Sequence, residues 1–461
     1  MRSRGQIVLT AAIVAVVAFT GVFLDRSVGV RDRSSAPEPS TSSGAWLCPH
    51  GAGPKDWAVT LEVANPGEAT ATVRVTSLGA DRPGKPKAYE VPPGTTLAIP
   101  AKAREREASS YVEYFGSWVA VGWVAHAEGS VGAENGVAAE PCAPGATGTW
   151  FAPEGTSVEG EDAYLIVVNP FDAPAILDVV MYTKGGPPAR IGEWSGFTLA
   201  PHRSVAFLLS ERVVNEEALS AEVDVSRGRV AVASLGVSAA AGGIRSAIGL
   251  AGAPPLRTYL PVAGPGGRST LTVVVPGTGP ATFDATLLSD GVPQPAGALT
   301  DQRQGAQSAE IAEVLSDGAS AIDVVASGEG VVVARRSAGL VNDSGSTAGV
   351  PGPASGWVVL PTAACDPNTP GLALVNPGEQ QAEVTLHILP RAGESPATDV
   401  TVSVPPARTV AAPEDFLAQD PHAAVLVTST PGTVIASGAS SSCGQVGISA
   451  FAVAVGIPLP T

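Results

Sequence analysis

The chain has 461 residues with 27 basic and 43 acidic side chains, a formal net charge of −16, and 53 glycines and 41 prolines. This length accommodates several domains, each able to bury its own core, and the Gly and Pro content is typical of short strands joined by many turns. A surface this acidic repels phosphate backbones, so we expect no nucleic-acid partner.

The amino terminus predicts a membrane anchor. Residues 1–6 carry two arginines and are predicted as a cytoplasmic tail, and residues 7–24 are eighteen residues without a charge, which at helical rise nearly span a bilayer core. Cleavage after Ala18 is the alternative, but the apolar run continues past that point and favours an uncleaved transmembrane signal-anchor. We expect a single-pass protein of the cell membrane whose C-terminal region is extracytoplasmic.

Residues 25–45 are rich in Ser and Pro and predict a semi-extended linker. Beyond the linker, one pattern recurs: an alternating apolar run ends in Asn-Pro and a second apolar run follows. Its Asn position falls at Asn65, Asn169, Val275 and Asn376, at intervals of 104, 106 and 101 residues. Each copy predicts two strands joined by a tight hairpin connection, within four tandem units.

A second marker agrees with this spacing. Each unit opens with a strand that ends in proline, at Pro49, Pro153, Pro261 and Pro361. We place the units at 46–147, 148–255, 256–352 and 353–461. About seven short strands in each 100 residues are typical of an immunoglobulin-like sandwich, whereas propeller blades are shorter. The expected fold is therefore all-β, with four tandem immunoglobulin-like β-sandwich repeats after an N-terminal transmembrane helix.

The four cysteines divide between the end units, and three pairings are open. We favour pairing within each unit, Cys48 with Cys142 and Cys365 with Cys443, because these bonds would join the first and last strands of the terminal units. Such disulfides indicate an oxidising compartment outside the membrane. A metal site is poorly supported, since each cysteine is isolated in sequence.

The sequence carries no recognisable catalytic motif, so we predict no catalytic, cofactor-binding or metal-binding residue. The loop from Gly79 to Lys85 matches the spacing of a phosphate-binding loop, but Pro86 replaces the hydroxyl residue that would hold magnesium. The five histidines do not cluster in sequence. A catalytic triad assembled from distant segments stays open, because triads are defined by geometry.

Two weaker features point to ligands. Strand parity places Trp123 in the core and leaves Tyr114 and Trp118 on the opposite face, where exposed aromatic rings would form a candidate ligand surface for sugars. The acidic turn Glu159 to Asp162 could hold calcium, although a solvated turn is the favoured interpretation.

The anchor, the Ser/Pro spacer, the Asn-Pro-Gly units and closing strands such as Val331 to Arg335 together resemble a family of actinobacterial membrane-anchored envelope proteins, a domain of unknown function. The resemblance covers about residues 46–457, implies a location and an architecture, and transfers no catalytic residue.

We expect a non-enzymatic extracytoplasmic binding or structural protein, a rod or a compact bundle of sandwiches, whose partner is an envelope protein or a cell-wall glycan. The alternatives are an accessory subunit of an envelope glycosyltransferase and a glycan-modifying hydrolase with a site between units.

Overall fold

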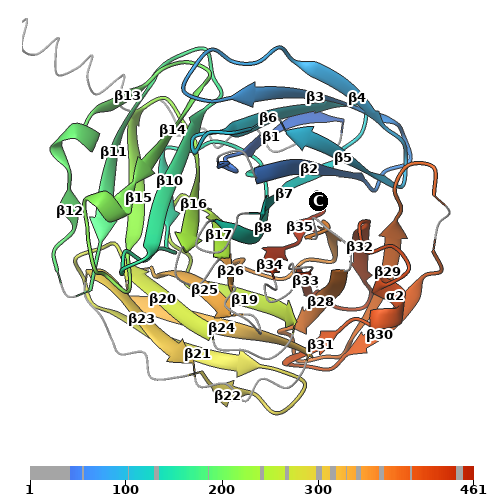
Figure 1. Cartoon of the computed structure of the whole chain (residues 1–461). Helices are drawn as coiled ribbons and strands as arrows, with labels where there is room; N and C mark the ends of the chain where they lie inside the picture. The colour runs from blue at the N-terminus through green and yellow to red at the C-terminus, as the bar shows by residue number, and fades with distance from the viewer. Residues whose placement is uncertain are drawn as a thin grey trace, which may run out of the picture. The chain divides into compact units, whose positions relative to one another are not determined.

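Antiparallel strands make up most of the structure, which is a computed structural model (Figure 1). It describes residues 42–53, 57–101, 103–128, 134–184, 186–238, 243–264, 269–296, 304–311, 318–328, 330–338, 344–362, 368–394, 397–442 and 450–460. All of these belong to one compact unit, Pro39–Thr461. The predicted tail and anchor, residues 1–24, lie outside the described residues. Within the described residues, no helix is long and apolar enough to cross a membrane.

The strands fall into four consecutive sets, which we call repeats 1 to 4. Repeat 1 contains β1 (Ser43–Cys48), β2 (Trp57–Asn65), β3 (Ala71–Leu78), β4 (Lys87–Val91), β5 (Thr95–Ala101), β6 (Ser109–Phe115), β7 (Ala120–Glu128) and β8 (Asn135–Pro141). Repeat 2 contains β9 (Thr149–Ala152), β10 (Glu161–Asn169), β11 (Ala175–Tyr182), β12 (Ala189–Arg190), β13 (Phe197–Leu199), β14 (Arg203–Leu208), β15 (Ser220–Arg227), β16 (Ala231–Ser238), β17 (Gly243–Ile248) and β18 (Leu250–Ala251), with the short helices η1 (Gly192–Trp194) and η2 (Leu209–Glu211).

Repeat 3 contains β19 (Arg257–Gly264), β20 (Ser269–Val275), β21 (Ala281–Leu288), β22 (Gln294–Pro295), β23 (Gly305–Ile311), β24 (Gly318–Gly328), β25 (Val332–Ala338) and β26 (Ser344–Thr347). Repeat 4 contains β27 (Gly356–Val359), β28 (Asn368–Asn376), β29 (Ala382–Leu389), β30 (Val400–Val404), β31 (Arg408–Ala411), β32 (Ala424–Ser429), β33 (Ile435–Ser442), β34 (Ala450–Val455) and β35 (Ile457–Pro458), with the helix α2 (Glu414–Leu417). The first strand begins at Ser43, inside the segment predicted as linker.

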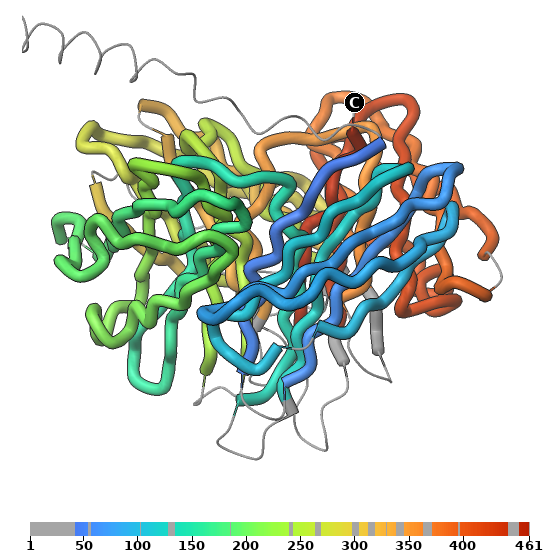
Figure 2. The backbone as a smooth tube through the Cα atoms, turned by 90° about the horizontal axis from the view of Figure 1, so that it is seen from above, coloured from blue at the N-terminus to red at the C-terminus, as the bar shows by residue number. Residues whose placement is uncertain are grey.

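Each repeat supplies two sheets that share a common order of four strands, to which repeat 2 adds β13 and β18 and repeat 4 adds β35. In repeat 1 these are β5-β2-β7-β8 and β1-β6-β3-β4, and Figure 2 follows the strands of this repeat side by side in blue and cyan. Buried valines from both sheets, such as Val63 and Val73, meet between them in one apolar core. The immunoglobulin order places the first two strands in one sheet. Here β1 and β2 lie in different sheets, because β1 pairs with β6 and β2 pairs with β5 and β7.

The Asn-Pro turns do not form hairpins, which corrects the sequence-based prediction. In repeat 1 the turn leads from β2 to β3, and these strands belong to different sheets, so the turn crosses the edge of the sandwich. The buried Asn65 side chain organises this crossing. Its Nδ2 donates to the carbonyl oxygens of Ala69 and Val91 at 2.8 and 2.9 Å, and its Oδ1 accepts from the Gly67 amide at 3.1 Å. The recurring asparagine is therefore a structural residue.

Asn169 and Asn376 make equivalent bonds in repeats 2 and 4. In repeat 3 the buried Val275 stands in this position, and it has no side-chain hydrogen-bonding group. Nearby, Gln304 Nε2 donates to the carbonyl oxygen of Pro276 at 2.8 Å. One polar side chain thus still bonds the crossing backbone in the degenerate copy, although it comes from a different strand connection.

Backbone hydrogen bonds join the repeats in a closed cycle. Backbone amides on the edge strands β14, β23 and β31 donate to the carbonyl oxygen of the residue that follows β3, β11 and β21 in the preceding repeat. These bonds run from Ser204 to Gly79 at 2.9 Å, from Ala306 to Thr183 at 3.1 Å and from Thr409 to Ser289 at 3.0 Å. On the matching edge strand of repeat 1, Thr96 donates to Pro390 of repeat 4 at 2.9 Å. The last repeat therefore bonds the first, which excludes the open rod and leaves the bundle.

The sheets that contain β2, β10, β20 and β28 also meet one another, each through the strand at its inner edge. In Figure 1, β8, β17, β26 and β34 lie together where the four repeats converge, and each contacts the next, with β34 closing back onto β8. Glycine is required at this convergence. A Cβ on Gly136, whose φ is +126°, would lie 2.9 Å from the backbone nitrogen of Ile244 in repeat 2.

Candidate functional site

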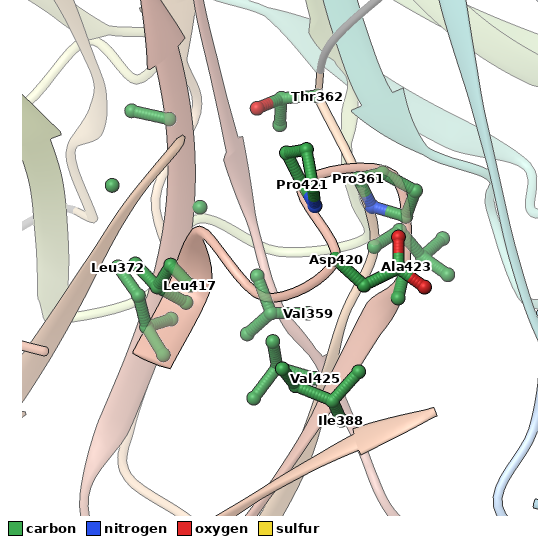
Figure 3. Close-up of a pocket in the computed structure, with 14 residues that line it drawn as sticks. Val359, Pro361, Thr362, Leu372, Ile388, Leu417, Asp420, Pro421, Ala423 and Val425 are labelled. Carbon is green, nitrogen blue, oxygen red and sulfur yellow. The ribbon is translucent and has the colours of Figure 1, made fainter. Parts of the chain in front are cut away.

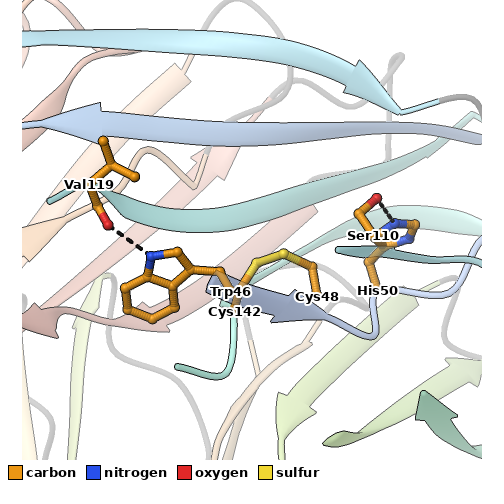
Figure 4. Close-up of a disulfide and its surroundings, with 6 residues drawn as sticks. All are labelled: Trp46, Cys48, His50, Ser110, Val119 and Cys142. Carbon is orange, nitrogen blue, oxygen red and sulfur yellow. Dashed lines mark hydrogen bonds between the residues drawn. A yellow bond between two sulfur atoms is a disulfide. The ribbon is translucent and has the colours of Figure 1, made fainter. Parts of the chain in front are cut away.

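The most enzyme-like group in the described residues is a Ser–His pair in repeat 1 (Figure 4). His50 follows β1 directly, and its Nε2 lies 3.0 Å from Ser110 Oγ on β6. Its Nδ1 lies 2.7 Å from the carbonyl oxygen of Gly51. A hydrogen on Nδ1 therefore donates to Gly51, and Nε2 accepts from the serine hydroxyl. This is the arrangement of a nucleophile and base, except that a backbone carbonyl replaces the carboxylate that orients a catalytic imidazole.

Burial argues against catalysis by this pair. His50 and Ser110 are each 1% exposed, so neither offers an atom to a substrate in solution. Burial lowers the pKa of His50 to about 4, opposed in part by the hydrogen bond to Gly51. The imidazole is therefore neutral at physiological pH. The pair satisfies two buried polar side chains and holds the end of β1 against β6.

A disulfide closes the same region of repeat 1. Cys48 on β1 bonds Cys142, which follows β8, with a Cα–Cα distance of 4.5 Å. This confirms the predicted pairing within the first unit. Beside it, Trp46 Nε1 donates to the carbonyl oxygen of Val119 at 2.9 Å, as Figure 4 shows. The other predicted pair, Cys365 and Cys443, lies outside the described residues.

The two aromatic rings of the candidate sugar-binding surface were predicted to be exposed, and this prediction is wrong. Tyr114 is fully buried and Trp118 is 6% exposed, so neither ring presents a face to solvent. Tyr114 packs over Gly44, where an added Cβ would lie 2.5 Å from the phenol oxygen, and Trp118 makes an edge contact with Trp46. Strand parity failed here because the three residues do not share a strand: Tyr114 lies on β6, Trp118 lies in the connection that follows it, and Trp123 lies on β7. Trp123 is buried, as predicted.

Three buried carboxyl groups were not predicted from the sequence. Glu140 on β8 is 2% exposed, and its carboxyl group faces the backbone of Ile248 in repeat 2. Burial raises the pKa of Glu140 well above its usual value, and a backbone hydrogen bond from Ile248 opposes this effect only in part. Its cross-strand neighbour is Trp123, whose indole nitrogen has no hydrogen-bond partner within the described part of the chain. The sequence signal for a buried carboxyl group was that Glu140 is the acidic residue of an otherwise uncharged strand, β8.

Glu154 lies in a buried ionic cluster between repeats 2 and 3. Its Oε1 accepts from Arg336 Nε of repeat 3 at 2.8 Å and lies 3.3 Å from Arg245 Nε of β17. Arg245 also pairs with Glu161 at 2.7 Å, so part of the acidic turn considered for calcium is used in an ion pair. Burial acts to raise the pKa of Glu154, but the two arginines more than offset this and hold it below its usual value.

Glu62 on β2 lies at the contact between repeats 1 and 4. It is 2% exposed and its Oε2 lies 3.1 Å from Arg391 Nη2. Burial raises the pKa of Glu62 to about 7, and the charge and hydrogen bond of Arg391 only partly oppose this effect. The pKa values of these two inter-repeat carboxyl groups are therefore shifted in opposite directions.

A small cavity lies in repeat 4 between its two sheets (Figure 3). Val359, Leu372, Leu417 and Val425 supply apolar walls, and Asp420 lies at its polar side. Its volume is about 30 Å³, which is room for about two water molecules and excludes a sugar or nucleotide. Among the described residues, no group of three His, Cys, Asp or Glu side chains is placed to hold a metal ion.

Comparisons with solved structures give weak matches. One is the tetra-tandem repeat in the extending region of a large adhesion protein, 10% identical, covering 91% of this chain and 100% of that one, with a TM-score of 0.12. Another is trypsin-activated alpha-2-macroglobulin from Escherichia coli, 10% identical, covering 91% of this chain and 42% of that one, with a TM-score of 0.12. Such low TM-scores carry no argument about this chain.

No curated protein matches the chain. The sequence model of DUF5719, described as a family of unknown function, matches residues 112–354. This segment runs from β6 of repeat 1 to the end of repeat 3 and is more than half of the chain. The chain therefore belongs to the DUF5719 family.

Proposed function

We propose that this protein is a non-enzymatic binding platform of the cell envelope, held at the membrane by residues 7–24 and presenting its repeats outside the membrane. The observation that carries the proposal is the closed cycle of hydrogen bonds between the repeats. A closed cycle restrains each repeat from two sides, so it limits how far the surface loops of different repeats can move relative to one another. Such restraint suits recognition of a large partner.

The partner class we propose is an envelope protein. The candidate stacking surface for a glycan was removed by the burial of Tyr114 and Trp118, whereas a protein partner needs only exposed loops and strand edges. The disulfide between Cys48 and Cys142 supports an oxidising, extracytoplasmic location. We propose that this envelope is that of an actinobacterium, as expected from the sequence.

We further propose that each repeat is a variant of the immunoglobulin-like sandwich. In repeat 1, β2 pairs with β5, and β3 pairs with β4 and β6, which matches the central pairings of that fold. The departure is that β1 lies beside β6 and β7 lies beside β2. The first strand and a late strand have thus exchanged sheets.

The hydrolase alternative would need a reachable nucleophile. Ser110 is the serine bonded to a histidine in the described residues of repeat 1, and both side chains are buried. Incubation of the full chain with a fluorophosphonate probe is therefore expected to leave Ser110 unlabelled. Labelling at Ser110, detected by peptide mass spectrometry, would contradict the non-enzymatic proposal.

The binding proposal is tested by cross-linking the tagged full chain on intact cells and identifying captured proteins by mass spectrometry. A chimera that carries residues 1–45 on an unrelated folded domain is the control for proteins captured near any anchored domain. We expect at least one envelope protein to be enriched over the chimera. A glycosyltransferase among them would assign an accessory role, and equal capture by both proteins would refute the platform.

A further inference from the structure

The interface between repeats 4 and 1 differs from the other three in how the chain holds it. Repeats 1 and 2, 2 and 3, and 3 and 4 are consecutive in sequence, so the chain joins each of these pairs directly. Within the described residues, repeats 4 and 1 meet through non-covalent contacts, which include the packing of β34 against β8. Repeat 4 also contributes the buried side chains of Val358, Leu389, Ala424 and Ile457 to the apolar core of repeat 1. We call the polar part of this interface the seam and define it by Glu62 and Thr96 of repeat 1 and by Leu389, Pro390, Arg391 and Ala424 of repeat 4.

Thr96 is the centre of the seam. It is fully buried, its backbone amide donates to Pro390 at 2.9 Å, and its hydroxyl donates to the carbonyl oxygen of Leu389 at 2.7 Å. The amide of Ala424 donates to the same hydroxyl oxygen at 3.1 Å. Separation of the repeats would break all three bonds together, so the seam is expected to open as a cooperative unit.

A charged pair lies next to these bonds. Arg391 donates through Nη2 to Glu62 and through Nε to the carbonyl oxygen of His422 at 2.9 Å. The Glu62 side chain is 3% exposed and that of Arg391 is 24% exposed. The carboxylate is therefore removed from water while its single cationic partner stays partly solvated, which makes an ionised Glu62 costly in the closed seam.

We propose that the seam is a latch that opens while the other three interfaces stay closed, and that the charge state of Glu62 sets how tightly it closes. A protonated Glu62 favours the closed seam, because a neutral acid is less costly to bury than a carboxylate. An ionised Glu62 favours opening, because the open seam returns its charge to water.

The surroundings of Glu62 contain few other charges. Its cross-strand neighbours are Ala98 on β5 and Gly122 on β7, which are uncharged. From repeat 4, Arg391 faces it directly, and Asp420 and His422 are the other titratable residues of the segment bonded to Arg391. Of these groups, Arg391 lowers the pKa of Glu62 through its charge and its hydrogen bond.

The direction of the pH effect follows from linkage. The pKa of Glu62 is about 7 in the closed seam and has an ordinary value of 4.5 when the group is exposed. The closed state therefore binds more protons between these values, so the stabilising contribution is complete below pH 4.5 and is lost as the pH rises through 7. Between pH 5 and pH 7, opening is expected to become more frequent by up to about 40-fold.

Amide hydrogen exchange in the full chain tests the latch with an internal control. Thr409 of repeat 4 makes the equivalent contact with repeat 3. Its amide donates to the carbonyl oxygen of Ser289 at 3.0 Å, and its hydroxyl donates to the carbonyl oxygen of Leu288 at 3.0 Å. We expect Thr96 to be less protected than Thr409, and the ratio of their protection factors to fall further between pH 5 and pH 7. Use of the ratio removes the intrinsic effect of pH on exchange.

Two variants separate the latch from general loosening. Glu62→Gln keeps the shape and removes the titration, so the Thr96 to Thr409 ratio is expected to become independent of pH. Glu154→Gln changes the carboxylate between repeats 2 and 3 and is expected to leave the pH dependence of that ratio as in the wild type. Equal protection of Thr96 and Thr409 at both pH values, or an unchanged pH dependence in Glu62→Gln, would overturn the proposal.

Discussion

Two buried glutamates join neighbouring repeats, and their surroundings give them opposite character. Glu154, between repeats 2 and 3, contacts two arginines, of which Arg245 is itself buried. Glu62, between repeats 4 and 1, contacts Arg391 alone. Burial acts to raise the pKa of both groups. The two arginines more than offset this effect at Glu154, whereas Arg391 offsets it only in part at Glu62. The number of buried cationic partners thus decides whether the pKa of these two inter-repeat carboxyl groups lies above or below its usual value.

The contrast has a consequence for stability. Glu154 has a lowered pKa, so its contribution is present above 4.5 and is lost as the pH falls through its folded-state pKa. Glu62 has a raised pKa, so its contribution is present below 4.5 and is lost as the pH rises through about 7. Acidification therefore weakens the interface of consecutive repeats and strengthens the seam.

The largest effect is expected from Arg245→Met. This change leaves Glu154 with one arginine and takes the partner of Glu161 away, so unfolding in urea at pH 7 should show a loss of about 3–5 kcal/mol. Arg257→Met is the matched control, because Arg257 pairs with Asp323 but its side chain is 49% exposed. The control should lose less than about 1 kcal/mol. Equal losses in both variants would contradict the importance of the buried cluster.

A smaller and pH-dependent effect is expected from Arg391→Met at the seam. Without Arg391, a buried Glu62 carboxylate has no cationic partner, so the loss should be about 2 kcal/mol at pH 8. At pH 5 Glu62 is protonated and the loss should be smaller. Urea midpoints at the two pH values measure this difference, and a loss independent of pH would show that Arg391 acts only through its bond to His422.

Substitution of the two glutamates should change stability with opposite signs. At pH 8, Glu62→Gln removes a poorly compensated buried charge and should stabilise the chain by about 1 kcal/mol. Glu154→Gln removes a well-compensated charge beside two arginines and should destabilise it. The measurement is the unfolding temperature of each variant relative to the wild type. Changes of the same sign in the two variants would contradict the opposite character of the two glutamates.

The smallest effect is expected from Thr96→Val and Thr409→Val. Each removes one hydroxyl that donates to a buried carbonyl oxygen across an interface, which costs about 1 kcal/mol. Thr96→Val should cost more, because its hydroxyl also accepts from the Ala424 amide. Urea unfolding of the two variants at one pH measures this difference, and a larger loss in Thr409→Val would contradict the role of Thr96 at the seam.

Local patterns in the sequence were sufficient for some of these features. The apolar alternation and the many turn residues predicted an all-β chain, because those patterns depend on neighbouring residues only. The pairing of Cys48 with Cys142 followed from their places at the start and end of one unit. The recurring asparagines were recognised, but their role was not: Asn65 bonds Val91, far along the chain, and turns the chain between sheets.

The tertiary structure alone decided which polar residues are buried and where the repeats meet. Tyr114 and Trp118 were misplaced because parity holds only within one strand, whereas β6 ends between these two residues and β7 begins after Trp118. Glu62 and Arg391 are 329 residues apart, and no local pattern connects them. The amino-acid sequence by itself determined the strands and turns of each repeat. The closed cycle and the charge state of its carboxyl groups depend on contacts and burial that exist only once the repeats are packed together.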